Sequence, residues 1–123
     1  MAHAINWFEI PATDINRALS FYKKILNANM EVFDMMGMES FFLPADMENG
    51  SIGGCVIQGE GYEPCHKGPL IYLNGGKDLN DILNRVETAG GKVMQSKTDI
   101  GDHGFYAFFE DSEGNKIGLH SNG

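Results

Sequence analysis

The sequence is poor in cysteine and in long apolar runs, and these shortages exclude several classes of protein. Its two cysteines, Cys55 and Cys65, form no CxxC pair, which argues against a structural zinc site. We expect two free thiols in a reducing compartment rather than a disulfide. No segment approaches the roughly 20 apolar residues of a membrane span, and the N-terminus lacks the basic and apolar regions of a signal peptide. These features predict a cytoplasmic protein.

Positive charge is also scarce. Nine Lys and Arg residues stand against 17 Asp and Glu residues, for a net charge of −8. Nucleic acid and anionic membrane surfaces repel such a chain, so we expect neither as a partner. The length of 123 residues suits one domain that buries its own core, and 42% hydrophobic residues is ordinary for a globular protein.

An internal repeat organises the chain. The segments TDINRAL (13–19) and KDLNDIL (77–83) share Asp, then Ile or Leu, then Asn, and Leu three positions later. Asp14 and Asp78 are predicted to cap helices, because their carboxylates can accept the free backbone N–H groups of a first turn. Apolar residues then recur at helical spacing, and Gly90–Gly91 predicts the end of the second helix.

Strand-like segments surround both predicted helices in the same order. One precedes each helix and three follow it: 4–10, then 30–36, 39–45 and 53–59; and 69–74, then 91–97, 104–110 and 115–120. Turn-forming residues separate the last two strands of each half. The pattern predicts a single α+β domain of two tandem βαβββ modules, with module 1 at about 1–59, a connector at 60–68 and module 2 at about 69–121.

Three segments carry a family resemblance: FEIPATDINRALSFYKKIL (8–26), VETAGGKVM (86–94) and FFEDSEGNKIGLH (108–120). They resemble the vicinal oxygen chelate superfamily of glyoxalases, bleomycin-resistance proteins and extradiol dioxygenases, and in particular its bacterial group related to lactoylglutathione lyase. The resemblance covers essentially the whole chain. It implies a curved mixed sheet around a cup-shaped cavity that takes a small-molecule ligand, and it implies a homodimer, because two-module members commonly pair.

In metal-dependent members of that superfamily, each module places a His on its first strand and a Glu on its last, and the bound divalent ion chelates two substrate oxygens. The matching positions here are Trp7 and Leu70 for the histidines, Gly118 for one glutamate, and Gly53 or Gly54 for the other. None of these side chains can hold a hard cation. We therefore expect a degenerate site with no metal and no cofactor.

The cavity-facing residues follow from strand alternation, since residues two apart share one face of a sheet. In each strand, we assign the positions that carry Phe, Ile or Leu to the face that packs against the helices. The alternate positions then face the cup. This pattern predicts a ligand-binding set of Trp7, Glu9, Tyr72 and His120. Aromatic rings with a polar atom suit the orientation of flat ligands in such pockets.

Glu9 and His120 are also the candidate catalytic residues. A carboxylate beside an indole costs several kcal/mol to bury unless it is paired or its pKa rises, so Glu9 could be a general base or a ligand anchor. It could equally be a carboxylate at a wet cavity mouth, or one hydrogen-bonded to a tyrosine, without chemistry. His120 suits proton transfer but lies near the C-terminus, where a histidine is often merely exposed. His103, on a glycine-flanked loop, could belong to a lid.

Three functions follow as hypotheses. The first is a small-molecule-binding protein of the drug-sequestering or sensing type, acting without a metal. The second is a lyase or isomerase in which Glu9, with His120, moves a proton next to a carbonyl, with or without assistance from a metal. The third is a structural or partner-binding subunit with a vestigial cup.

Overall fold

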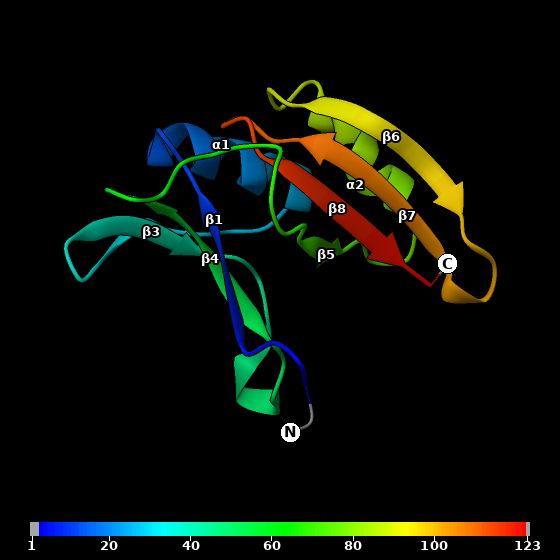
Figure 1. Ribbon diagram of the computed structural model, residues 1–123, viewed down its shortest axis with the longest axis horizontal. Helices are drawn as coiled ribbons and strands as arrows, with labels where there is room; N and C mark the ends of the chain where they lie inside the picture. Colours follow the sequence, from blue (N-terminus) through cyan, green and yellow to red (C-terminus); the bar gives the residue numbers. More distant parts are fainter. Residues whose placement is uncertain (1–2, 123) are drawn as a thin grey trace.

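The computed structural model describes residues 3–122, apart from the side chain of Met47. The chain forms two βαβββ modules in the predicted order (Figure 1). The elements of module 1 are β1 (Trp7–Pro11), α1 (Ile15–Leu26), β2 (Phe33–Met35), β3 (Met38–Phe42), the 3-10 turn η1 (Met47–Asn49) and β4 (Gly53–Gln58). Those of module 2 are β5 (Tyr72–Asn74), α2 (Leu79–Val86), β6 (Lys92–Asp99), the 3-10 turn η2 (Gly101–His103), β7 (Phe105–Glu110) and β8 (Lys116–Ser121).

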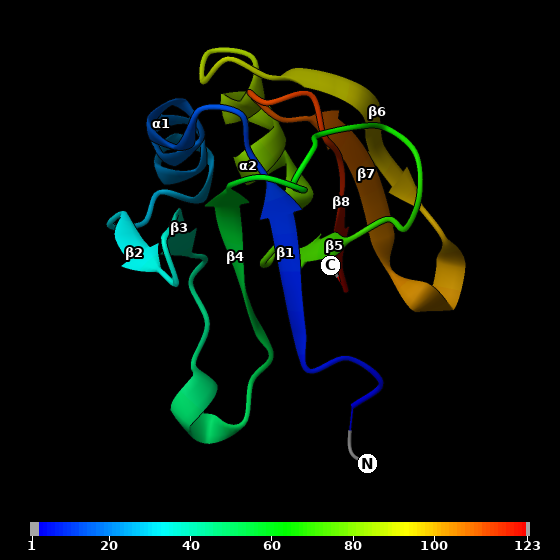
Figure 2. The same cartoon turned by 60° about the vertical axis from the view of Figure 1, so that its left-hand side comes forward.

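The strands make two four-stranded sheets with identical topology. The first sheet has the order β1-β4-β3-β2 and the second has the order β5-β8-β7-β6. In each, the module's first and last strands pair in parallel and the other pairs are antiparallel. The predicted α+β fold class is thus confirmed, with the mixed sheet of each module formed separately. Figures 1 and 2 show α1 beside α2, each next to its own sheet.

Local capping explains both helix starts. The Asp14 Oδ1 atom accepts hydrogen bonds from the backbone N–H groups of Asn16 (3.1 Å) and Arg17 (3.2 Å), and Asp78 accepts one from Asn80 (3.0 Å). Helix α1 ends at Asn27, whose φ of 49° lies in the left-handed region that stops a helix. Among residues 3–122, neither helix is long and apolar enough to cross a membrane.

One apolar core fills the space between the helices and the sheets. Phe8 and Ile10 of β1 pack into it, as do Ile117 and Leu119 of β8, which confirms the predicted helix-facing positions. The modules also share aromatic contacts. The ring centroid of Phe21 on α1 lies 5.9 Å from that of Phe109 on β7. Burial of this shared surface therefore holds the two modules together.

Strand β5 is shorter than the predicted segment 69–74. It begins at Tyr72, and the register of β5 against β8 pairs Tyr72 with Gly118. Leu70 lies before the strand, so the assignment of Leu70 to the first-strand position of module 2 is wrong. The register in module 1 pairs Trp7 with Gly53. Tyr72 and Gly118 are thus the module 2 counterparts of Trp7 and Gly53.

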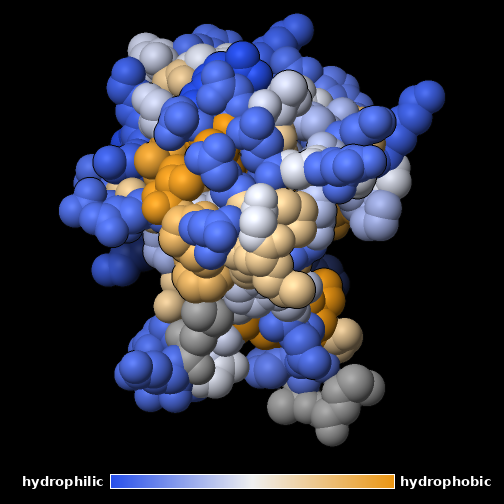
Figure 3. Space-filling view, turned by 90° about the vertical axis from the view of Figure 1, so that its left-hand side faces the viewer, coloured by the Kyte–Doolittle hydropathy of each residue, from blue (hydrophilic) through white to orange (hydrophobic). Residues whose placement is uncertain are grey.

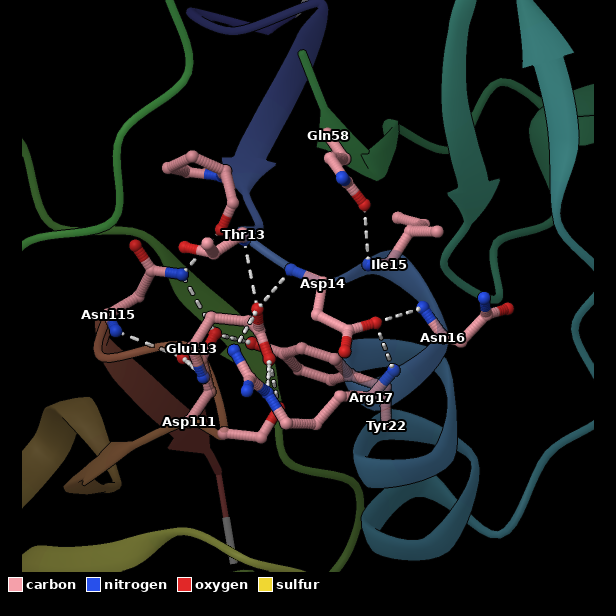
Figure 4. A network of polar contacts seen from close by, with 12 residues as sticks. Thr13, Asp14, Ile15, Asn16, Arg17, Tyr22, Gln58, Asp111, Glu113 and Asn115 are labelled. Atoms are coloured by element: carbon pink, nitrogen blue, oxygen red, sulfur yellow. Dashed lines mark hydrogen bonds and ion pairs between the residues drawn. The ribbon is translucent and has the colours of Figure 1, made fainter.

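Figure 4 shows how the β7–β8 turn of module 2 docks on the N-terminus of α1 in module 1. The side chain of Glu113 is fully buried and accepts hydrogen bonds from the backbone N–H groups of Thr13 (2.9 Å) and Asp14 (2.7 Å). Arg17 Nε donates to the same carboxylate at 2.7 Å. A carboxylate at a helix N-terminus is favoured by the free N–H groups and the helix dipole.

Asp111 lies behind Glu113 and completes this intermodule network. Its carboxylate accepts from Tyr22 Oη at 2.7 Å, from Asn115 Nδ2 at 3.0 Å, and from the backbone N–H groups of Glu113 and Asn115 at 2.9 Å each. Asn115 also donates to the carbonyl oxygen of Pro11 at 2.7 Å. The DSEGN turn, part of the segment that carries the family resemblance, therefore joins the modules.

The carboxyl group of Glu113 makes the stability of the fold depend on pH. Burial raises the pKa of its carboxyl group, but hydrogen bonds from Arg17 and the backbone of Asp14 outweigh burial and hold the pKa below its ordinary 4.5. A carboxyl whose pKa is depressed by folding stabilises the native state above its unfolded pKa, and this contribution is lost as the pH falls through the folded pKa. We expect Glu113→Gln to lower the free energy of unfolding at pH 7, by an amount that shrinks steadily below pH 4.5.

Urea unfolding of both proteins across this pH range measures the difference. Glu31→Gln is the matched control, because Glu31 is exposed and the charge change is the same. A gap between wild type and Glu113→Gln that is independent of pH would contradict the role assigned to the carboxylate charge.

Candidate functional site

An open cavity of about 1200 Å³ lies on the second sheet, where the ends of β5 and β8 meet the β6–β7 turn. In Figure 1 this region is close to the C-terminus. The lining residues all belong to module 2 or its end: Tyr72, Leu73, Asn74, Gly76, Lys77, Ile100, Tyr106, His120, Ser121 and Asn122. We call this cavity the module 2 pocket. It contains two of the four predicted ligand-binding residues, Tyr72 and His120.

Aromatic rings form one wall of the module 2 pocket. Tyr72 is 49% exposed, and its ring lies against Gly118 so closely that a Cβ atom there would come within 2.6 Å of the Tyr72 Cδ1 atom. The ring of Phe108 lies 5.9 Å from that of Tyr72 and 5.2 Å from that of Tyr106, centroid to centroid. The space beside Gly118 is therefore filled by the ring of Tyr72 and does not widen the cup.

His120 holds the loop at the edge of the pocket. Its Nε2 atom lies 2.6 Å from the carbonyl oxygen of His103 in η2. Because a carbonyl oxygen only accepts hydrogen bonds, Nε2 is the donor, and the tautomer of a neutral ring that fits this contact has no proton on Nδ1. His120 is thus fixed in position by the loop that precedes β7. His103 contributes its backbone carbonyl oxygen to this contact, not its side chain.

Glu9 and Trp7 lie on the first sheet. The Glu9 Oε1 atom accepts a hydrogen bond from Tyr62 Oη at 2.9 Å, and the Trp7 Nε1 atom donates to Oε2 at 3.4 Å. The bond to Glu9 and partial desolvation raise the pKa of Tyr62, and burial followed by the Glu9 charge raises the pKa of the Cys55 thiol to about 11. Glu9 is therefore a hydrogen-bonded carboxylate with a tyrosine partner, which matches one of the alternatives that the sequence left open.

The face around Trp7 is rich in exposed apolar groups. Trp7 meets Phe42 edge to face at 5.6 Å between ring centroids, and Phe42 meets Phe33 at 4.7 Å. Met36, in the turn between β2 and β3, is 95% exposed. Figure 3, which views the molecule from the side where β3 lies, shows apolar residues gathered in the middle of the face among hydrophilic ones. We call Trp7, Phe33, Met36 and Phe42 the module 1 patch.

The structure therefore brings the predicted residues together in two pairs, Trp7 with Glu9 and Tyr72 with His120, and the module 2 pocket has no lining residue from module 1. Sequence reasoning missed Tyr62, Lys77 and Tyr106. Alternation along β7 could have found Tyr106, because it shares a face with Phe108. No local pattern pointed to Tyr62, which lies in the connector.

The positions that match the family's metal ligands carry mostly side chains that cannot bind a metal ion. They carry Trp7 beside Gly53 and Tyr72 beside Gly118, and the Tyr72 ring occupies the space into which a side chain at 118 would project. Indole and glycine side chains offer no metal ligand, so among these four positions the phenol of Tyr72 carries the one oxygen. Across the described part of the chain, no group of three or more His, Cys, Asp or Glu residues is arranged to hold a metal.

Comparison with known proteins identifies the family. Residues 4–119 match the model of the glyoxalase/bleomycin resistance protein/dioxygenase superfamily. A glyoxylase-like domain-containing protein from Didymella fabae is 31% identical over 117 residues, which cover 90% of this chain and 88% of that protein. The chain belongs to the glyoxalase/bleomycin resistance protein/dioxygenase superfamily, as its sequence motifs indicated.

Two further matches extend the comparison. The putative glyoxylase CFP32 of Mycobacterium bovis is 25% identical over 116 residues, which cover 93% of this chain but only 44% of that protein. A glyoxalase/bleomycin resistance protein from Albidiferax ferrireducens has a TM-score of 0.69 at 13% identity, covering 96% of this chain and 98% of that one. The structural likeness shows the same fold along 96% of the chain.

Proposed function

We propose that this protein binds a small organic molecule in the module 2 pocket without a metal ion. The observation that carries the proposal is the exposed aromatic wall of the pocket. Tyr72 is 49% exposed beside an open cavity, although burial of its aromatic ring would be energetically favourable. An apolar, concave surface with a few polar groups is the usual form of a small-molecule site.

Two observations support the absence of a metal from this function. Three of the four residues at the family's ligand positions, Trp7, Gly53 and Gly118, have side chains that cannot ligate a metal, and the ring of Tyr72 covers Gly118. A reducing, cytoplasmic location is also part of the proposal, and the free thiols of Cys55 and Cys65 support it.

Enzymatic proton transfer is the second candidate function, favoured by the geometry of His120. Its Nε2–H group is committed to the carbonyl oxygen of His103, so Nδ1 is the atom that can take a proton. Glu9 is not among the residues that line the pocket of its own chain. It would act together with His120 only if the first sheet of one chain faced the second sheet of another chain.

A homodimer is therefore part of the proposal. The module 1 patch leaves Trp7 37% and Phe42 41% exposed, and the module 2 pocket is open on one side. A second copy that places its module 1 patch over this pocket would cover both surfaces and would unite Glu9 with His120. If this proposal is correct, we expect a mass measurement in solution to give two chains per particle.

A screen of metabolites and aromatic drugs for thermal stabilisation tests the binding function. A ligand at 100 times its Kd adds about 2.7 kcal/mol to the free energy of unfolding. We expect Tyr72→Ala to weaken the affinity for the ligands found by about tenfold, because the ring supplies a large buried contact. Met94→Ala is the control, since Met94 is 41% exposed and lies outside both the pocket and the module 1 patch.

Unchanged affinity of Tyr72→Ala for every ligand would contradict the assignment of the pocket, and one divalent ion held tightly per purified chain would contradict the metal-free function. Glu9→Gln separates the two candidate functions. An enzyme loses turnover with its ligand still bound, whereas a binding protein shows no turnover to lose.

A further inference from the structure

We propose that the ligand of the module 2 pocket is a planar organic anion, with its carboxylate held by Lys77 and Asn74 and its flat body packed against Tyr72 and Tyr106. This inference rests on the proposed binding function and adds the chemical class of the ligand. It is carried by the distribution of charge and by the orientation of one amide.

The charge of the pocket is opposite to that of the protein. The chain has 17 acidic and nine basic residues, yet the lining of the pocket includes one lysine, one histidine and no Asp or Glu. Two acidic residues directly adjoin lining residues in sequence. Asp78 is paired with Lys97 at 2.9 Å and caps the backbone of Asn80, and Asp99 accepts the backbone N–H of Gly101 at 2.7 Å. A cavity without carboxylates in so acidic a chain favours an anion, because a cation would lack a counter-charge there.

Asn74 presents hydrogen-bond donors to the pocket. Its Oδ1 atom accepts the backbone N–H of Gly76 at 3.0 Å. With the oxygen committed in this way, the Nδ2 amino group is the free end of the side chain and can only donate. A ligand that meets it must offer an acceptor such as a carboxylate oxygen.

Lys77 adds a positive charge three residues further along. It is exposed, lines the pocket, and makes no ion pair with the residues that the structure describes. An ammonium group beside a fixed amide donor is suited to a carboxylate, which accepts charge-assisted hydrogen bonds from both.

The remainder of the wall suits a flat apolar body. Tyr72 lies in register with Gly118 and Phe108, and Tyr106 lies two residues along the sheet, in register with His120 and Asn74. Both tyrosine rings contact the ring of Phe108. Ile100, 38% exposed, lies at the edge. Aromatic rings stack on planar groups and leave the polar end of the ligand to Lys77 and Asn74.

The test compares benzoate with benzamide, two molecules of the same shape of which only benzoate is charged. Calorimetry or saturation-transfer NMR on the full chain gives their affinities. We expect benzoate to bind more tightly than benzamide, with an affinity that falls as salt is added, whereas the affinity for benzamide stays constant.

Two variants assign the contacts. Lys77→Gln is expected to weaken benzoate binding about three- to fivefold, as for an exposed ion pair. Asn74→Asp keeps an oxygen to accept from Gly76 N but replaces the donors with negative charge, so we expect a loss of about tenfold or more for benzoate and none for benzamide. Lys67→Gln is the matched control, because Lys67 carries the same charge and lies in the connector, outside the pocket.

The outcomes separate this inference from the function on which it rests. If benzamide binds as tightly as benzoate, and Lys77→Gln and Asn74→Asp leave both affinities unchanged, the pocket binds ligands but the anionic class is wrong. If neither probe binds and the stabilisation screen finds no ligand sensitive to Tyr72, both proposals fail.

Discussion

Asp111→Ala is expected to lower the free energy of unfolding by about 3–4 kcal/mol, the largest loss for any polar substitution considered. The carboxylate is 2% exposed and accepts four hydrogen bonds, from Tyr22 Oη, Asn115 Nδ2 and two backbone N–H groups. Alanine would leave these donors buried without partners, and each unpaired buried donor costs about 1–3 kcal/mol before the structure relaxes. Chemical unfolding at pH 7 measures the loss.

Tyr22→Phe and Asp111→Asn are the matched controls. The phenylalanine variant removes one donor together with its need for a partner, so we expect a loss of only about 1 kcal/mol. Asparagine keeps an oxygen for the two backbone N–H groups and should fall between the other two variants. Equal losses for all three proteins would contradict the account of Asp111 as the centre of the intermodule network.

Gly104→Ala is expected to destabilise the fold by about 3 kcal/mol and to weaken ligand binding in the module 2 pocket. Gly104 has φ 97° and ψ −131°, a conformation open almost only to glycine, and a Cβ atom there would lie 2.2 Å from the carbonyl oxygen of Ser121. Its own carbonyl oxygen accepts the N–H of Ile100 at 2.9 Å, so the change would displace the edge of the pocket.

Gly101→Ala is the control for this prediction. Gly101 lies at the other end of η2 with φ 72°, but nothing lies within 4 Å of an added Cβ atom. We expect Gly101→Ala to lower the free energy of unfolding by only about 1 kcal/mol, which is the cost of a left-handed backbone conformation for alanine. Urea unfolding and calorimetric titration of both variants make the comparison, and a loss at 101 as large as that at 104 would argue against steric exclusion at Ser121.

The parts of the fold that were predictable from sequence depend on local patterns. Asp14 and Asp78 cap helices because a carboxylate two or three residues before free N–H groups reaches them whatever the rest of the chain does. The inward positions of Phe8 and Ile10 follow from alternation in the same way. The length of β5 was not predictable, since Leu70 and Ile71 are apolar but the paired register with β8 begins at Tyr72, and Ile71 contributes only a carbonyl oxygen that accepts the N–H of Gly118 at 2.8 Å.

The candidate site was less predictable, because its geometry depends on contacts between distant segments. Alternation shows which face of a strand Glu9 occupies but not that Tyr62, 53 residues later, donates to it. It also does not show that the faces bearing Trp7 and Tyr72 belong to separate sheets. Lys77 became a candidate only when the structure showed it lining one cavity that lacks carboxylates.

The capping of α1 by Glu113 has a consequence for the order of folding. Thr13 N and its acceptor are 100 residues apart in sequence, so the N–H groups of Thr13 and Asp14 at the start of α1 receive this acceptor only after residue 113 has been made. Contacts of such long range slow folding, because most of the loop entropy is lost before they form. An emerging chain therefore exposes an incomplete module 1 to chaperones and proteases until the last two strands arrive.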